Sequence, residues 1–207
     1  PLPLQTRILH QKARYLRAGG DLEAAAQCVS KALEHPTPRA YLLHFEAACI
    51  HLVSGQLERC LEACRVGADL AEAAKDLRYF GLFLDRKAAV IRRGGQYDQS
   101  ETLSLQAIDA LAACGALWDE TTARGNYALV PFYRGELDGA ARAYERVIEE
   151  ARAVNSRTVK ASAQGNLGSI LTMLRRHEEA DRVLQEALAD QAALGQWSGM
   201  AMAHFFL

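Results

Sequence analysis

The sequence lacks the features by which membrane, secreted and nucleic-acid-binding proteins are most easily recognised. No apolar run approaches the roughly 18 residues of a membrane-spanning helix, and residues 1–20 have no continuous apolar core of the kind a signal peptide carries. The five cysteines are odd in number and show no secreted disulfide pattern, so we expect a reducing, cytoplasmic compartment. The net charge of −1 gives no sign of a direct nucleic-acid or membrane partner.

Residue patterns typical of enzymes and of cofactor sites are also missing. The sequence has no Ser/His/acid arrangement and no paired buried carboxylates. Its Gly-Gly pairs recur at a repeated turn, so they do not indicate a phosphate-binding loop. We therefore predict a protein that is not an enzyme and that carries no cofactor. We interpret Cys60 and Cys64 as buried packing residues. A zinc site at this place would need His44 and His51 as further ligands.

What the sequence does contain is a repeat with a period of 40 residues. The segments 55–60, 95–100, 135–140 and 175–180 begin 40 residues apart, and a fifth copy begins at residue 20. A fixed period in this range is typical of a stacked array of supersecondary units. We predict that residues 1–207 form a single array. Its repeats lie at about 1–37, 38–76, 77–116, 117–156 and 157–196, and 197–207 begin a further helix.

Each repeat is predicted to consist of a helix A, a tight turn and a helix B. In the fourth repeat, two apolar stripes at helical spacing flank Gly135, which suits the left-handed end of a helix. A second turn recurs at Gly115, Asn155 and Gly195, whose residue types tolerate the left-handed conformation. Pro131 lies late in this repeat's helix A and is expected to kink it or to shift its backbone bonding.

Small residues recur where paired helices must approach closely. Seven residues before the first turn the sequence has Ala13, Ala48, Ala88, Ala128 and Gly168, and five after it Ala25, Cys60, Ser100, Ala140 and Ala180. This spacing resembles the tetratricopeptide repeat (TPR) family, and the segment Asn166-Leu-Gly-Ser-Ile170 is like a phrase of its longer variants. The 40-residue period departs from the usual 34 and is similar to that of kinesin light chains and LGN-type scaffold proteins. The resemblance implies an all-α fold, a TPR-like α-solenoid of about five helix-turn-helix repeats in a right-handed superhelix.

Charge divides sharply between the A and the B segments. The A segments (1–20, 38–55, 77–95, 117–135 and 157–175) hold 15 Lys and Arg but only 4 Asp and Glu. The B segments hold 9 Lys and Arg and 21 Asp and Glu. In TPR arrays the A helices line the concave groove, so the resemblance implies a basic groove, which favours acidic peptides or a free carboxylate. Helix capping and the helix dipole explain part of the asymmetry, but not mid-helix residues such as Arg14 and Arg86.

The resulting prediction is a protein-interaction scaffold that binds a peptide or helix, acidic in character, in this groove. Arg14, Arg17, Arg86 and Arg93 are expected to bind carboxylates, Asn126 and Asn166 the peptide backbone, and Tyr133 and Met173 apolar side chains. The role of the two asparagines follows from the TPR resemblance. A solvated or inter-repeat asparagine is the alternative at both positions.

A second reading is a regulatory or oligomerisation arm of a larger bacterial signalling ATPase or transcription regulator. The Ala-, Arg- and Leu-rich, Lys-poor composition fits a GC-rich bacterial source. The chain begins without Met and ends on the apolar segment 198–207, so we expect a fragment of a longer protein that self-associates through its exposed C-terminal end. Trp118 and Trp197 are expected to pack across repeats rather than to hold a ligand.

Overall fold

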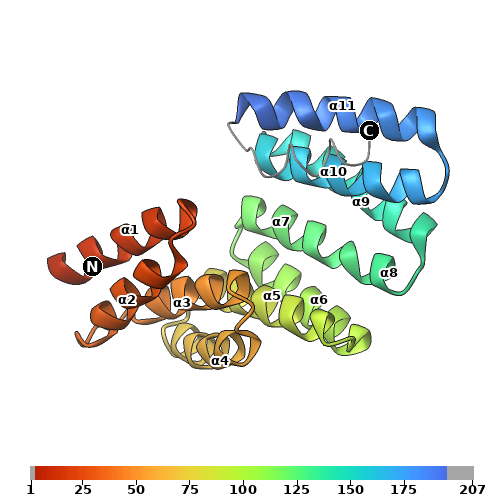
Figure 1. Ribbon diagram of the computed structural model, residues 1–207. Coiled ribbons are helices and arrows are strands. Elements are labelled where there is room, and N and C mark those ends of the chain that lie inside the picture. The colour runs from red at the N-terminus through yellow and green to blue at the C-terminus, as the bar shows by residue number, and fades with distance from the viewer. Residues whose placement is uncertain (1–2, 195–207) are drawn as a thin grey trace. The chain divides into compact units, whose positions relative to one another are not determined.

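The computed structural model describes residues 3–194, which fold into α-helices and turns without a β-strand. The helices are α1 (Leu4–Ala18), α2 (Leu22–Leu33), α3 (Tyr41–Val53), α4 (Leu57–Ala73), α5 (Leu77–Arg93), α6 (Tyr97–Ala113), α7 (Leu117–Tyr127), α8 (Leu129–Tyr133), α9 (Leu137–Ala153), α10 (Arg157–Met173) and α11 (His177–Ala193). They form two compact units, Pro1–Gly115 and Ala116–Leu207. Within each unit, successive helices pair into hairpins (Figure 1). That residues 1–207 form a single array stays a prediction.

The turns lie where the repeat predicts them. A residue with positive φ ends the first helix of each pair: Gly20, Gly55, Gly95, Gly135 and Arg175. The turn that follows the second helix has the same conformation at Lys75, Gly115 and Asn155. Glycine adopts this conformation without a Cβ clash, whereas a residue such as Arg175, at φ 59°, does so at a cost of about 1–2 kcal/mol. The predicted turns are therefore confirmed, except for Gly195, which lies outside the described residues.

The predicted small residues lie at the contact between the paired helices, and all of them are buried. In two pairs this contact is also a hydrogen bond. Cys60 Sγ donates to the carbonyl of Ala48 at 3.3 Å, and Ser100 Oγ donates to that of Ala88 at 2.9 Å. The close helix approach is confirmed, and Cys60 is one of the side chains that allow it.

Helix A of the fourth pair is interrupted, as Pro131 predicts. α7 ends at Tyr127 and α8 begins at Leu129, with Ala128 between them. Pro131 has no N–H to donate to the carbonyl of Tyr127, four residues earlier, so the regular bonding fails at this point. The short α8 carries Tyr133 to the end of the helix, where the chain turns at Gly135.

The core of the Pro1–Gly115 unit is centred on aromatic rings of α3 and α5. Phe83 is 1% exposed, and its ring meets that of Phe45 edge to face at a centroid distance of 5.6 Å. α4 completes this core at Gly67. A Cβ added there would lie 2.1 Å from Cζ of Phe83, so the glycine makes room for the ring.

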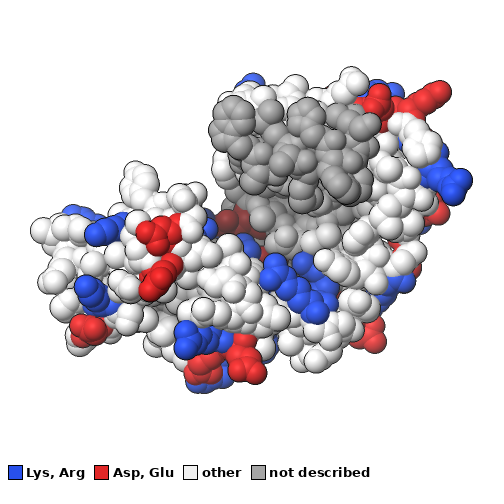
Figure 2. Space-filling view, viewed as in Figure 1, with Lys and Arg blue, Asp and Glu red and all other residues white. Residues whose placement is uncertain are grey.

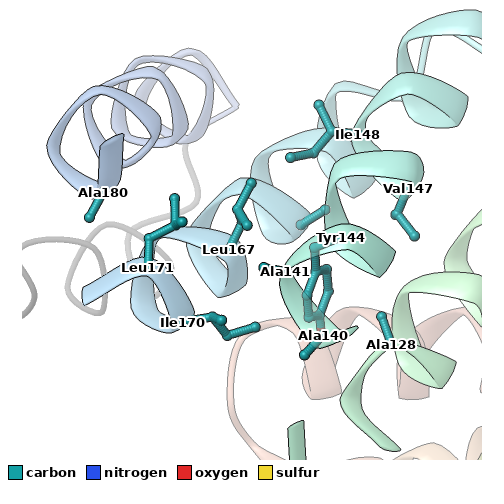
Figure 3. Packing of buried hydrophobic residues seen from close by; sticks show 11 residues of the cluster. Ala128, Ala140, Ala141, Tyr144, Val147, Ile148, Leu167, Ile170, Leu171 and Ala180 are labelled. Atoms are coloured by element: carbon teal, nitrogen blue, oxygen red, sulfur yellow. The ribbon is translucent and has the colours of Figure 1, made fainter. Parts of the chain in front are cut away.

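The core of the Ala116–Leu207 unit is centred on Tyr144 of α9. Its side chain is 0% exposed and lies among buried residues of α9 and α10 (Figure 3). Leu167, Ile170 and Leu171 line the facing side of α10, and Ala180 brings in α11. A phenol ring at the centre of an aliphatic core places a polar hydroxyl close to the surface of α10.

Some sequence predictions concern residues beyond the described range. Trp197, the apolar segment 198–207 and the self-association expected from it lie outside residues 3–194. Within that range, none of the helices combines the length and the apolar character that crossing a bilayer requires.

Candidate functional site

A pocket of about 230 Å³ lies between α7, α9 and α10 in the Ala116–Leu207 unit. Asn126 and Asn166, one repeat period apart, both line it, and so does Tyr144. Hydroxyl groups of Thr122 and Ser162 add polar atoms, and no lining residue carries a charge. The structure thus brings the two predicted asparagines to one uncharged pocket, whose lining also includes the apolar side chains of Val147, Val159 and Ala163.

The polar groups of this pocket are held in place by hydrogen bonds. Asn166 Nδ2 donates to the Tyr144 hydroxyl at 3.1 Å. Since the amide nitrogen is the donor here, the amide oxygen of Asn166 keeps its capacity to accept. Thr122 Oγ1 donates to the carbonyl of Trp118 at 2.9 Å. Such an arrangement can bind uncharged hydrogen-bonding groups, of which the peptide amide is the commonest in proteins.

The predicted arginines Arg17 and Arg93 lie in the Pro1–Gly115 unit and have partners within it. Arg17 Nε donates to Glu46 Oε1 at 2.6 Å, and Glu46 is only 3% exposed. Glu46 occupies the repeat position that Asn126 and Asn166 hold in the other unit. Arg93 Nη1 donates to the carbonyl of Leu52 at 3.1 Å. Both arginines therefore serve in part to join neighbouring A helices.

Arg86 and Arg14 are less engaged. The closest carboxylate of Arg86 is that of Asp85, at 3.8 Å, which exceeds a hydrogen-bond distance. Its Nε is buried without a hydrogen-bond partner among the described residues. Arg14 is exposed on α1, where it lines a surface hollow with Arg17. Arg14 therefore keeps its donors at the surface for an anion, whereas Arg86, whose guanidinium lies 5.9 Å from the centre of the Phe45 ring, keeps only its Nη donors.

The two apolar candidates are exposed at the ends of their helices. Tyr133 is 47% exposed and Met173 is 54% exposed, and they stand one period apart. Arg93 occupies the same repeat position in α5. All three side chains therefore lie at the surface, just before the turn that leads to the next helix.

The excess of positive charge on the A segments is partly neutralised by ion pairs. Lys160 Nζ lies 2.7 Å from Asp190, and Arg124 Nε lies 3.5 Å from Glu150, both of them carboxylates of B segments. On the face of the Pro1–Gly115 unit seen in Figure 2, basic and acidic side chains are interspersed. On this face, positive charge thus comes from individual side chains rather than from a uniformly charged surface.

Cys60 and Cys64 are buried and lie close together on α4. A hydrogen bond with Cys64 lowers the pKa of the Cys60 thiol, and the same bond raises the pKa of Cys64. Over residues 3–194, no group of three or more His, Cys, Asp or Glu side chains is placed to hold a metal ion. The expectation that these thiols are packing residues is confirmed by their burial.

Trp118 differs from the sequence expectation. Its side chain is 58% exposed, and its indole N–H donates to the carbonyl of Val154 at 2.9 Å. Val154 follows α9, the partner helix of α7, so this bond closes one helix pair and does not join two repeats. The predicted antiparallel pairing brings the start of α7 to the end of α9, but the sequence does not show which group the indole N–H reaches there.

Burial lowers the pKa of His10, His44 and His51 below the ordinary value of 6.5, with desolvation as the largest cause in each case. Glu46 raises the pKa of His10 and Arg14 lowers it, and each of these effects is smaller than that of burial. The unfolded chain then binds protons more tightly than the folded one. The contribution of these histidines to the free energy of unfolding should therefore be fully present above pH 6.5 and decrease as the pH falls below 6.5.

This pH dependence can be measured as the urea midpoint at several pH values between about 7.5 and 5. The triple variant H10Q/H44Q/H51Q should show a smaller loss on acidification. His177→Gln, at an exposed position of α11, is the matched control and should leave the dependence unchanged. An equal loss in the triple variant and the parent would contradict the assignment to these histidines.

No protein-family model matches the chain, and no curated protein sequence matches it. Solved structures are similar to it. A Rap protein in complex with competence and sporulation factor has a TM-score of 0.86 at 12% identity, and the match covers 100% of this chain and 58% of that one. PlcR from Bacillus thuringiensis, in complex with the peptide PapR7 and DNA, has a TM-score of 0.79 at 14% identity. This match covers 96% of this chain and 73% of that one.

A signal transduction ATPase with numerous domains from Pyrococcus horikoshii, which carries a tetratricopeptide repeat sensor, is a further similar structure. Its TM-score is 0.75 at 12% identity, and the match covers 98% of this chain and 33% of that one. The chain thus spans a third of the ATPase and less than two thirds of the Rap protein. At these identities the likeness concerns the fold.

Proposed function

Because the chain has a TPR-like fold, we propose that it is a protein-interaction module that binds an extended peptide against its A helices. The observation that supports this most directly is the neutral pocket that Asn126 and Asn166 share. Two amide side chains one repeat apart can each pair with the backbone of an extended ligand. PlcR, which has a similar fold, is in complex with a peptide.

The pocket's chemistry favours the backbone of the ligand and its uncharged side chains. Tyr144 holds Asn166 through the 3.1 Å hydrogen bond, so the asparagine is oriented before the ligand arrives. A preorganised donor and acceptor lose little entropy on binding. Tyr133 and Met173, exposed in the same unit, supply apolar surface for a ligand side chain.

The binding of an acidic group is a separate and finer part of this proposal, and it concerns the Pro1–Gly115 unit by itself. Arg14 and Arg86 have donors to spare and would bind a carboxylate through charge-assisted hydrogen bonds. Arg93 would contribute its remaining donors, and Arg17 would have to share its guanidinium with Glu46. Glu46 itself disfavours an acidic group close to Arg17.

The test is selection of binding peptides from a random display library, followed by affinity measurements with the parent and with Asn166→Ala. We expect the variant to bind the selected peptides about tenfold more weakly, since one amide partner contributes about 1–1.5 kcal/mol. Gln185→Ala removes an exposed amide on α11 and should leave the affinity unchanged.

Salt separates the two parts of the proposal. Peptides with Asp or Glu should bind more weakly as ionic strength rises, because screening weakens an exposed charge pair. Equal affinity at low and high salt would remove the acidic part and leave the amide part standing. Equal affinity of the parent and Asn166→Ala would remove the amide part.

A second candidate function is that of a sensor or regulatory arm within a larger signalling protein. The observation in its favour is the similarity to the repeat sensor of the archaeal ATPase, of which this chain spans 33%. This function requires a nucleotide-binding or DNA-binding domain in the same polypeptide. A parent gene that encodes neither would exclude it.

A further inference from the structure

The Ala116–Leu207 unit has a second cleft, of about 330 Å³, between α9, α10 and α11. Its floor is apolar and includes Ile148, Leu167 and Leu171. Its lining residues with a charge are Glu145, Glu149, Arg152, Glu179, Arg182 and Glu186. The carboxylates outnumber the guanidinium groups by four to two, so the cleft is acidic.

Several of these carboxylates are not neutralised by the protein. Glu145 and Glu149 are exposed, and in the described part of the chain neither forms an ion pair within 4 Å. Glu186 is 49% exposed and lies 3.9 Å from Arg152. Glu179 differs, because Arg176 holds it at 2.7 Å. Glu145 and Glu149 of α9 are therefore available to a cation, and Glu186 of α11 is paired with Arg152 only at long distance.

Gln164 of α10 also lines the cleft and carries an unsatisfied acceptor. Its side-chain amide nitrogen donates to Glu186 Oε2 at 2.8 Å. A carboxylate only accepts, so this bond fixes which end of the amide is the nitrogen. The other end, Oε1, is buried and has no donor within hydrogen-bond distance among residues 3–194, in a residue that is 2% exposed. A buried acceptor without a donor is unfavourable, and a ligand N–H would relieve it.

These features match a lysine side chain. Its aliphatic stem would cover the apolar floor while the ammonium group faces the carboxylates. An ammonium has three donors that point in different directions, and Gln164, Glu186 and Glu149 offer acceptors from three different helices. The planar fork of arginine suits a single carboxylate better. Because Glu186 is half-exposed, its second carboxylate oxygen can accept from the incoming cation while Oε2 keeps its bond to Gln164.

We propose that the cleft between α9, α10 and α11 is a second binding site of this protein, which takes a lysine side chain of a basic peptide. It shares no residue with the pocket of Asn126 and Asn166. It also attracts the opposite charge from Arg14 and Arg86, which would bind a carboxylate. The cleft and the pocket can therefore be tested separately, and one module could bind two partners at once.

The test is a titration of the ¹⁵N-labelled protein with a blocked tetralysine peptide, followed by NMR. We expect shifts of the Gln164 side-chain amide and of backbone amides in α9 and α11. E149Q/E186Q should bind about three- to tenfold more weakly, as expected for two partly exposed carboxylates. E178Q/D181N, an equal change of charge at two exposed positions of α11 outside the cleft, should bind within a factor of about two of the parent.

Gln164→Met separates a binding role from a structural one. The variant keeps the side-chain volume and removes both the unpartnered oxygen and the hydrogen bond to the half-exposed Glu186, so its urea midpoint should change little while the tetralysine affinity falls. An unchanged affinity would overturn the role of Gln164. Equal weakening by E149Q/E186Q and by E178Q/D181N would overturn the site, because it would indicate diffuse attraction to the acidic B helices.

Two further probes identify the occupant. Spermidine carries ammonium groups without a peptide chain, and tetra-arginine carries guanidinium groups on one. Spermidine that binds as tightly as tetralysine would overturn the peptide ligand in favour of a free polyamine. Tetra-arginine that binds more tightly than tetralysine would overturn the assignment to lysine.

Discussion

Replacement of Tyr144 by alanine is expected to lower the free energy of unfolding by about 3–5 kcal/mol, because it empties the centre of a core. The ring is 0% exposed and is surrounded by the packed faces of α9 and α10. The neighbouring side chains are aliphatic and cannot collapse into a space of this size without moving a helix. Urea denaturation followed by circular dichroism would measure the loss.

Tyr144→Phe is the matched variant for this experiment. It keeps the ring and removes only the hydroxyl that accepts from Asn166, so a loss of about 1 kcal/mol is expected. If Tyr144→Ala costs no more than Tyr144→Phe, the ring is not the centre of the core. Tyr144→Phe also bears on function, since it frees Asn166 while the protein stays folded. A weaker affinity for selected peptides would indicate that Tyr144 orients the asparagine.

Replacement of Gly67 by alanine is the second large effect, and it acts on the Pro1–Gly115 unit. The added Cβ would lie 2.1 Å from Cζ and 2.4 Å from Cε1 of Phe83. Alanine is favoured over glycine in a helix by about 1 kcal/mol. A buried ring that must leave its position costs more than that, so we expect a net destabilisation of about 1–3 kcal/mol. The urea midpoint would report it.

A compensating change shows whether the clash is the cause. Phe83→Leu shortens the side chain that faces Gly67, so Gly67→Ala should be nearly neutral or stabilising in that background. A double-mutant cycle measures this coupling as the departure from additivity. Gly165→Ala is the control. A Cβ there meets only Gln191 Nε2, at 3.8 Å, so alanine should keep its helical advantage. Additive effects of Gly67→Ala and Phe83→Leu would rule out the ring as the obstacle.

The candidate sites gain different support from sequence and structure. The equivalence of Asn126 and Asn166 is visible in the repeat, but their common pocket depends on how α7 and α10 pack on α9. The cleft with Gln164 has no counterpart among the sequence predictions. Its signal in the sequence is the acidic excess of the B segments, which does not tell which carboxylates lack partners.

The sequence by itself determined the helix pairs, because each depends on residues close along the chain. A repeated Gly or Asn predicts the turns, and their positive φ values confirm them. The small residues before and after each turn predict where paired helices touch, since a short turn leaves one antiparallel register. Pro131 predicts the break between α7 and α8 for an equally local reason, a missing N–H.

Only the tertiary structure decided the partners of the polar side chains. Arg17 finds Glu46, 29 residues away, and Asn166 finds Tyr144, 22 residues away. Trp118 bonds to Val154 across its own helix pair, which the sequence analysis did not predict. The physical reason is that a hydrogen bond or ion pair depends on distances of a few ångströms between side chains of different helices. A period in the sequence fixes which residues share a position, but not which neighbouring side chain each of them reaches.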